Sequence, residues 1–199
     1  MYFNSWSNLT KRLFEYNLNL LKKGLFPKGV AIGTHNGTFG EWVPSVLSNI
    51  TNAILIEASL PQFLELKKNY EHFDNVKLIN EIISTRGQIL RFWEGQEGQA
   101  NSIHKDVTYN WEKHKDSIKH RLTTTTNINK YVKKDTNWLH LDTEGYDADL
   151  ILNLKYLPKF IIFEYDQLEK DELHFLKETL GRKNYTFTFE NNNCLAELL

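Results

Sequence analysis

The sequence has 199 residues, 41% of them apolar and 13% aromatic, with 24 Lys and Arg against 25 Asp and Glu. This is an ordinary globular composition, so we predict a single domain over residues 1–199. The net charge of −1 argues against a nucleic-acid partner or a membrane surface, and no apolar run approaches the roughly 20 residues that span a bilayer.

The first part of the chain alternates amphipathic stretches with short apolar runs. The leading segment, residues 1–28, carries Leu9, Leu13, Leu20 and Leu21 at helical spacing and predicts a helix over 8–25. Strands are then predicted at 29–33, 53–57 and 76–79, with helices over 38–47 and 61–70 between them. Strand, helix, strand in this order predicts a parallel sheet covered on both faces.

The alternation breaks from residue 86 to residue 126. Residues 87–93, GQILRFW, predict a strand, residues 94–102 are turn-like, and the polar stretch after them has no clear period. A long interruption inside a compact domain is typical of a functional loop. We therefore predict that residues 86–126 are an insertion that covers the active site.

The last part of the chain completes the predicted sheet. A short helix is expected at 128–132, strands at 138–141 and 159–163, and a helix at 167–180. Two final strands, 185–190 and 194–199, flank three asparagines and predict an antiparallel hairpin. The fold class is therefore α/β, with seven strands in a mostly parallel sheet and helices on both faces.

A glycine-rich turn follows the first predicted strand. Gly33, Gly37 and Gly40 lie between that strand and the next helix, where glycine lets the backbone approach a ligand. Glu57 ends the second strand, where an acid can bind both hydroxyls of a ribose. The alternative to a ligand site is that the glycines only form an ordinary turn and that Glu57 is a solvated charge at the end of its strand. Together the two features favour a nicotinamide dinucleotide or S-adenosylmethionine as cofactor.

A nicotinamide-dependent oxidoreductase is one alternative. A short-chain dehydrogenase needs a Tyr-x-x-x-Lys pair for proton transfer, and Tyr109 and Lys113 have this spacing. They lie in the irregular insertion, however, where that class would not place them. The final hairpin also favours a methyltransferase sheet.

Two carboxylates follow the fourth predicted strand. In the segment LHLDTEGYDADLILNL, Asp142 and Glu144 come at the strand's end and Gly145 opens an amphipathic helix. Acids at this edge of an open α/β sheet lie where such sheets bind ligands. The alternative is that Asp142, Glu144 and Asp147 only cap the helix.

This segment, with TTTTNINKYV before it and FIIFE after it, resembles the FkbM-type S-adenosylmethionine-dependent methyltransferases. The turn VAIGTHNG, the strand LIEAS and the stretches NEIIS, RGQILRFW and Asn101-Ser102-Ile103 match that family in the same order, over roughly residues 29–165. The resemblance implies a class I methyltransferase sheet, Rossmann-like with a C-terminal hairpin. It also implies O-methylation of a saccharide or a similar small metabolite.

The resemblance also implies roles for individual residues. Asp142 and Glu144 are the candidate catalytic residues, and Tyr146, Trp93 and Glu164 the candidate substrate contacts. The candidate cofactor contacts are Gly33, Thr34, His35, Asn36, Gly37, Thr38, Glu57, Ala58, Glu81 and Ile82. A divalent metal held by acids such as Asp142 and Glu144, lowering the pKa of the acceptor hydroxyl, is an open alternative to a carboxylate base. No Cys/His cluster has zinc-ligand spacing and no spacing demands another metal, so we predict none.

Two positions depart from the family pattern. Ala31 stands where the family usually carries an acid, two places before the first glycine, and His35 replaces a more usual Asn. A non-catalytic cofactor-binding or scaffold protein of the same fold is therefore a second alternative. The single cysteine, Cys194, and a start without a signal-peptide pattern lead us to expect a cytoplasmic protein.

Overall fold

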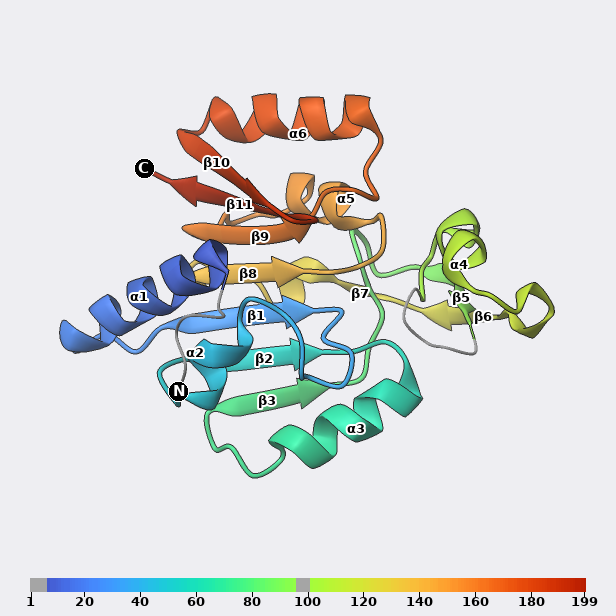
Figure 1. Cartoon of the computed structure of the whole chain (residues 1–199), viewed down its shortest axis with the longest axis horizontal. Helices are drawn as coiled ribbons and strands as arrows, with labels where there is room; N and C mark the ends of the chain where they lie inside the picture. The colour runs from blue at the N-terminus through green and yellow to red at the C-terminus, as the bar shows by residue number, and fades with distance from the viewer. Residues whose placement is uncertain (1–6, 96–100) are drawn as a thin grey trace.

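The computed structural model describes residues 7–95 and 101–199. Its centre is a seven-stranded sheet in the order β10-β11-β9-β8-β1-β2-β3. All pairs are parallel except those of β11, which runs antiparallel to both neighbours (Figure 1). The strands are β1 (Lys28–Ile32), β2 (Asn52–Ile56), β3 (Val76–Ile79), β8 (Trp138–Leu141), β9 (Phe160–Glu164), β10 (Tyr185–Glu190) and β11 (Asn193–Leu198). The predicted fold class and the seven strands are confirmed.

The strands form where the sequence has continuous apolar runs, because a parallel sheet is buried on both faces. All four residues of β8 are buried. Alternate residues point to opposite faces. In β1, Val30 and Ile32 therefore join one apolar cluster, while Ala31 joins the other.

Helices cover both faces of the sheet. Apolar side chains from α1 (Asn8–Lys22), α2 (Val43–Leu47) and α3 (Leu60–Tyr70) pack on one face. Those from α5 (Asp147–Leu152) and α6 (Lys170–Gly181) pack on the other. The described helices include none that is long and apolar enough to cross a membrane.

Two predicted helices are shorter than expected. The leading helix ends at Lys22, and Gly24 follows with φ +74°, a left-handed conformation that stops a helix. Residues 1–6 of the leading segment lie outside the described residues, and Lys28 belongs to β1. The helix predicted over 38–47 is wrong in its first half, because Gly40 has φ +109° and α2 begins only at Val43.

The insertion forms a small unit of its own. Its core is an antiparallel ribbon of β5 (Ile89–Glu94) and β6 (Lys119–Thr124), with α4 (Lys105–Trp111) beside it. Figure 1 shows this unit beyond the carboxyl ends of the parallel strands. The strand predicted at 87–93 is confirmed as β5, whereas the polar stretch contains an unpredicted helix and strand. Residues 96–100 of the predicted turn lie outside the described residues.

Short elements join the insertion to the sheet. Two-residue strands β4 (Ile83–Ser84) and β7 (Thr126–Asn127) pair in parallel where the chain leaves and re-enters the core. The helix predicted at 128–132 is a single 3₁₀ turn, Ile128–Lys130. These elements place both ends of the insertion near β3 and β8.

Candidate functional site

A cavity of about 270 Å³ opens at the carboxyl ends of the parallel strands. Ligands in open α/β sheets bind at this edge. Most of its polar lining comes from the turns after β1, β2 and β8, and the insertion adds two apolar and two polar side chains. The cavity is lined by Ile32, Gly33, His35, Phe39, Glu57, Ala58, Glu81, Ile82, Ile83, Phe92, Asn101, Ser102, Ile103, Asp142, Thr143, Glu144 and Tyr146.

The glycine turn is built for close backbone approach. A Cβ added at Gly33 would lie 1.7 Å from the carbonyl oxygen of Asp142, so only glycine lets the turns after β1 and β8 meet. A Cβ at Gly37 would lie 2.3 Å from the ring of Tyr70. The Tyr70 hydroxyl donates to the Gly37 carbonyl at 2.5 Å, and Asn69 donates to the Asn36 carbonyl at 2.8 Å. The end of α3 therefore fixes the turn, which the sequence did not indicate.

The predicted turn residues divide into two groups. Gly33 and His35 line the cavity, and both ring nitrogens of His35 are buried without a hydrogen-bond partner in the described structure. The others do not line it. Thr34 is buried with its hydroxyl on the Ile56 carbonyl, while Asn36 accepts the Thr38 N–H at 3.1 Å. Asn36, Gly37 and Thr38 shape the turn rather than the cavity wall.

Glu57 ends β2 and holds two loops together. Its carboxylate accepts the N–H of His35 and the N–H of Ser59, each at 2.7 Å. Burial raises the pKa of Glu57, although these N–H donors oppose the rise. Each carboxylate oxygen has a second lone pair, so the group can still accept hydroxyl donors from a ligand in the cavity.

The wall beyond β3 combines one acid with apolar side chains. Glu81 and Ile82, which the sequence suggested as cofactor contacts, line the cavity next to Ile83 and Phe92. The carboxylate of Glu81 accepts hydrogen bonds from the Tyr131 hydroxyl at 2.7 Å and from Lys130 at 3.0 Å. The sequence did not predict Ile83 or Phe92 as site residues, because the contribution of the insertion depends on how it packs.

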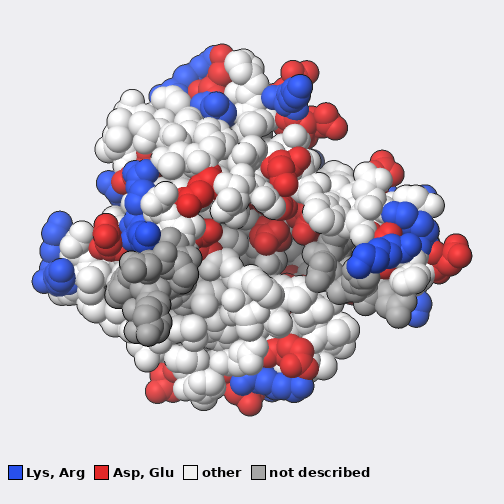
Figure 2. All heavy atoms as spheres, in the orientation of Figure 1, with Lys and Arg blue, Asp and Glu red and all other residues white. Residues whose placement is uncertain are grey.

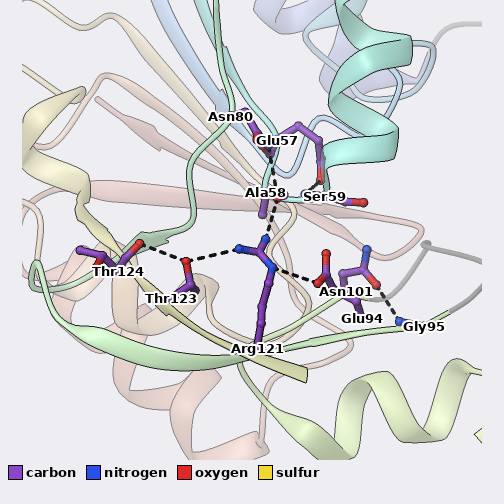
Figure 3. Close-up of polar contacts among 10 residues, drawn as sticks. All are labelled: Glu57, Ala58, Ser59, Asn80, Glu94, Gly95, Asn101, Arg121, Thr123 and Thr124. Carbon is purple, nitrogen blue, oxygen red and sulfur yellow. Dashed lines mark hydrogen bonds and ion pairs between the residues drawn. The ribbon is translucent and has the colours of Figure 1, made fainter. Parts of the chain in front are cut away.

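Arg121 ties the insertion to the loop after β2. Its guanidinium donates to the Ala58 carbonyl at 3.4 Å, to Glu94 at 3.0 Å and to the Thr123 hydroxyl at 3.3 Å. Figure 3 shows this side chain reaching from β6 toward the Glu57–Ser59 loop, with Asn80 binding the same loop from its far side. The insertion is thus anchored at the rim of the cavity, and its role as a cover stays a prediction.

The acids after β8 have different environments. Asp147 is fully buried and accepts the N–H of Thr143 at 3.0 Å, the Thr143 hydroxyl and the N–H of Glu164 at 3.1 Å. These hydrogen bonds join the loop after β8 to β9 and do not cap α5, so the role of Asp147 is structural but is not the predicted helix cap. The carboxylates of Asp142 and Glu144 line the cavity and have no hydrogen bond or ion pair with any described residue.

Electrostatics in this part of the site favour protonated carboxyls. Burial, reinforced by repulsion from neighbouring acids, raises the pKa of Asp142 to about 7 and that of Glu144 to about 9. Burial also raises the pKa of Asp147 to about 7 and that of Glu164 to about 8. Strongly raised carboxyl pKa values in a cavity mark a candidate functional site.

The predicted substrate contacts lie in three places. Tyr146 lines the cavity, and its hydroxyl lies 3.2 Å from the Thr85 hydroxyl. Glu164 is outside the lining but joins Asp142 and Glu144 in one cluster. Trp93 is also outside the lining and packs against His120, with Lys105 over its ring.

The pair that motivated the oxidoreductase alternative is not part of the cavity. Tyr109 lies on α4, is 44% exposed and is absent from the lining, as is Lys113. The Lys115 ammonium donates to the Tyr109 carbonyl and lies 4.7 Å from the centre of its ring. The leading helix α1 also contributes no residue to the cavity lining.

Comparison with solved structures shows the fold. A human methyltransferase 10 domain containing protein aligns with a TM-score of 0.50 and 13% identity, over 96% of this chain and 80% of that chain. The METTL16 methyltransferase domain aligns with a TM-score of 0.50 and 14% identity, over 96% and 81%. No protein-family model and no curated protein matches the sequence. The chain has a class I, Rossmann-like methyltransferase fold, and membership of the FkbM type stays a prediction.

Proposed function

We propose that the chain is an S-adenosylmethionine-dependent methyltransferase of FkbM type that methylates a hydroxyl group of a saccharide or a similar small metabolite. The observation that supports this most is the meeting of Gly33, Glu57 and Asp142 around one cavity. These residues come from three different strand ends of a methyltransferase-type sheet. The motifs that suggested the family from sequence thus share a single site.

The residues around the cavity fit this cofactor. The buried ring nitrogens of His35 have no partner in the described structure, and a buried polar atom without one costs free energy until a ligand supplies it. The free lone pairs of Glu57 suit the two hydroxyls of a ribose. Ile82, Ile83 and Phe92 offer an apolar wall for a purine ring.

The roles of the residues follow from their positions. When bound, S-adenosylmethionine would supply an electrophilic methyl group, which would pass to the acceptor oxygen while the sulfur leaves as a neutral thioether. The glycine turn and Glu57 would orient the cofactor, while Tyr146 and the insertion shape the space for the acceptor. Alignment of the methyl group with the acceptor oxygen would give most of the rate acceleration. Asp142 or Glu144, in its ionised form, would accept the proton of the acceptor hydroxyl, a contribution of about 10²–10⁴-fold.

Replacing Asp142 by Asn tests this assignment. We expect Asp142→Asn to lower the rate of methyl transfer about 10²–10⁴-fold, because the amide cannot accept the hydroxyl proton. Asp149→Asn is the matched control, since Asp149 is an exposed acid on the neighbouring helix α5 and lies outside the cavity lining. Transfer is measured from methyl-labelled cofactor to a panel of saccharides, hydroxylated metabolites and RNA.

Incorporation into a hydroxylated small molecule, lost in Asp142→Asn and kept in the control, supports the proposal. A full rate in Asp142→Asn would remove that residue from the mechanism. Incorporation into RNA alone would contradict the proposed acceptor class.

A further inference from the structure

Three carboxylates meet where strands β8 and β9 end. The register pairs Leu141 of β8 with Phe163 of β9, so the next residues, Asp142 and Glu164, leave neighbouring strands side by side. Glu144 follows in the loop after β8. One carboxylate oxygen from each of the three lies within 4.8 Å of the others.

Glu144 and Glu164 of this cluster are half-buried, and Asp142 is its most exposed member. Within residues 7–95 and 101–199, the backbone N–H of Asp142 donates to the Ile32 carbonyl at 3.0 Å, but its carboxylate has no hydrogen bond or ion pair. The Oε2 atom of Glu164 is buried and also has no hydrogen-bond partner there. An unpaired buried carboxylate is costly. Asp147, close by, has three donors, so the lack of partners is particular to the cluster.

No described basic side chain forms an ion pair with these three carboxylates. The ion pairs of the described residues involve other acids, such as Glu81 with Lys130 and Glu94 with Arg121. Figure 2 shows acidic side chains around the hollow in the middle of this face, with most Lys and Arg at its periphery. Several converging carboxylate oxygens without a basic partner suit a positive ion.

We propose that Asp142, Glu144 and Glu164 bind a divalent cation, Mg²⁺ or Mn²⁺, beside the cavity. The ligand set contains only carboxylate oxygens, which favour hard cations over zinc or copper. The three acids supply part of an octahedral shell, leaving positions for water or for oxygens of a substrate. This proposal replaces the prediction, made from spacing alone, that the chain has no metal site.

The metal site also suggests how the acceptor hydroxyl is activated, and this part of the inference rests on the proposed function. Asp142 and Glu144 line the cavity, so the cation faces the space for the acceptor. A bound cation lowers the pKa of a hydroxyl that coordinates it. Coordination positions that the protein leaves open would suit an acceptor with neighbouring oxygens, such as a vicinal diol of a saccharide. The carboxylates then act on the acceptor through the cation.

Manganese binding tests the site without cofactor or acceptor. Protein freed of metal by a chelator is titrated with Mn²⁺, and free Mn²⁺ is followed by electron paramagnetic resonance. We expect one Mn²⁺ per chain, displaced by excess Mg²⁺, and an affinity at least about tenfold lower in Glu164→Gln. Asp149→Asn is the control and should bind as the wild type does. The same loss of Mn²⁺ affinity is expected for Glu144→Gln, which replaces Glu164→Gln as the test variant if Glu164→Gln does not fold.

Wild-type protein that binds no Mn²⁺ at roughly millimolar concentrations would overturn the site, as would equal affinity in the wild type and the folded variant. Thermal unfolding gives a second readout, because Mg²⁺ should raise the Tm of the wild type but not that of Glu164→Gln. The assay contains the metal alone, so its outcome is independent of methyl transfer. Cofactor binding without metal binding would overturn this inference and leave the proposed function intact.

Discussion

Gly33→Ala is expected to lower the free energy of unfolding by about 2–5 kcal/mol and to abolish cofactor binding. The new Cβ would lie 1.7 Å from the backbone oxygen of Asp142, and Gly33 has φ +76°, which favours glycine. Relief requires moving the turn after β1 or the loop after β8, and both line the cavity. Urea unfolding and calorimetric titration with S-adenosylhomocysteine measure the two effects.

Gly24→Ala is the matched control. Gly24 has φ +74°, but an added Cβ would meet nothing within 4 Å. This variant should lose only about 1 kcal/mol and bind the ligand normally. Equal losses of stability in the two variants would show that the backbone conformation, and not the contact with Asp142, explains the effect at Gly33.

Ala31→Asp, which restores the acid of the resembling family, is expected to lower the free energy of unfolding by about 3–5 kcal/mol at neutral pH. Ala31 is fully buried, in the apolar cluster that contains Leu9, Trp42 and Trp138. The new carboxylate would have no charged partner in that cluster. The structure thus opposes the simple idea that an acid here strengthens cofactor binding.

The loss in Ala31→Asp should depend on pH. Burial raises the pKa of the new carboxyl in the folded state, while in the unfolded chain it stays near 4. Stability is therefore lost as the pH rises from the unfolded pKa to the folded pKa, and regained on acidification. Ala31→Asn, uncharged and of similar size, should show no such dependence relative to the wild type. A stable Ala31→Asp variant with tighter cofactor binding would contradict this account.

The sheet was predictable because its strands are continuous apolar runs. Val76–Ile79 and Trp138–Leu141 form strands with the predicted bounds. The helix predicted over 38–47 begins only at Val43, because Gly40 has φ +109° and interrupts the helical backbone. Pro44 lies in the first turn of α2 and was the available signal for a later start.

The candidate site was only partly predictable. Glu57 and Asp142 follow strands directly, and strand ends of a parallel sheet converge, so their meeting could be expected. The approach of Glu164 to Asp142 depends on the register between β8 and β9, and Phe92 reaches the cavity through packing of the insertion. Such contacts join distant segments and leave no local pattern in the sequence.

Calorimetric titration with S-adenosylhomocysteine tests the central claim, that the cavity binds the methyl-transfer cofactor. We expect one site per chain in the wild type and about 10–100-fold weaker binding in Glu57→Ala, which lacks the carboxylate for the ribose hydroxyls. Glu71→Ala, an exposed acid at the end of α3, is the control and should bind normally. Absence of binding by the wild type, undiminished binding by Glu57→Ala, or saturation with NAD instead would contradict the claim.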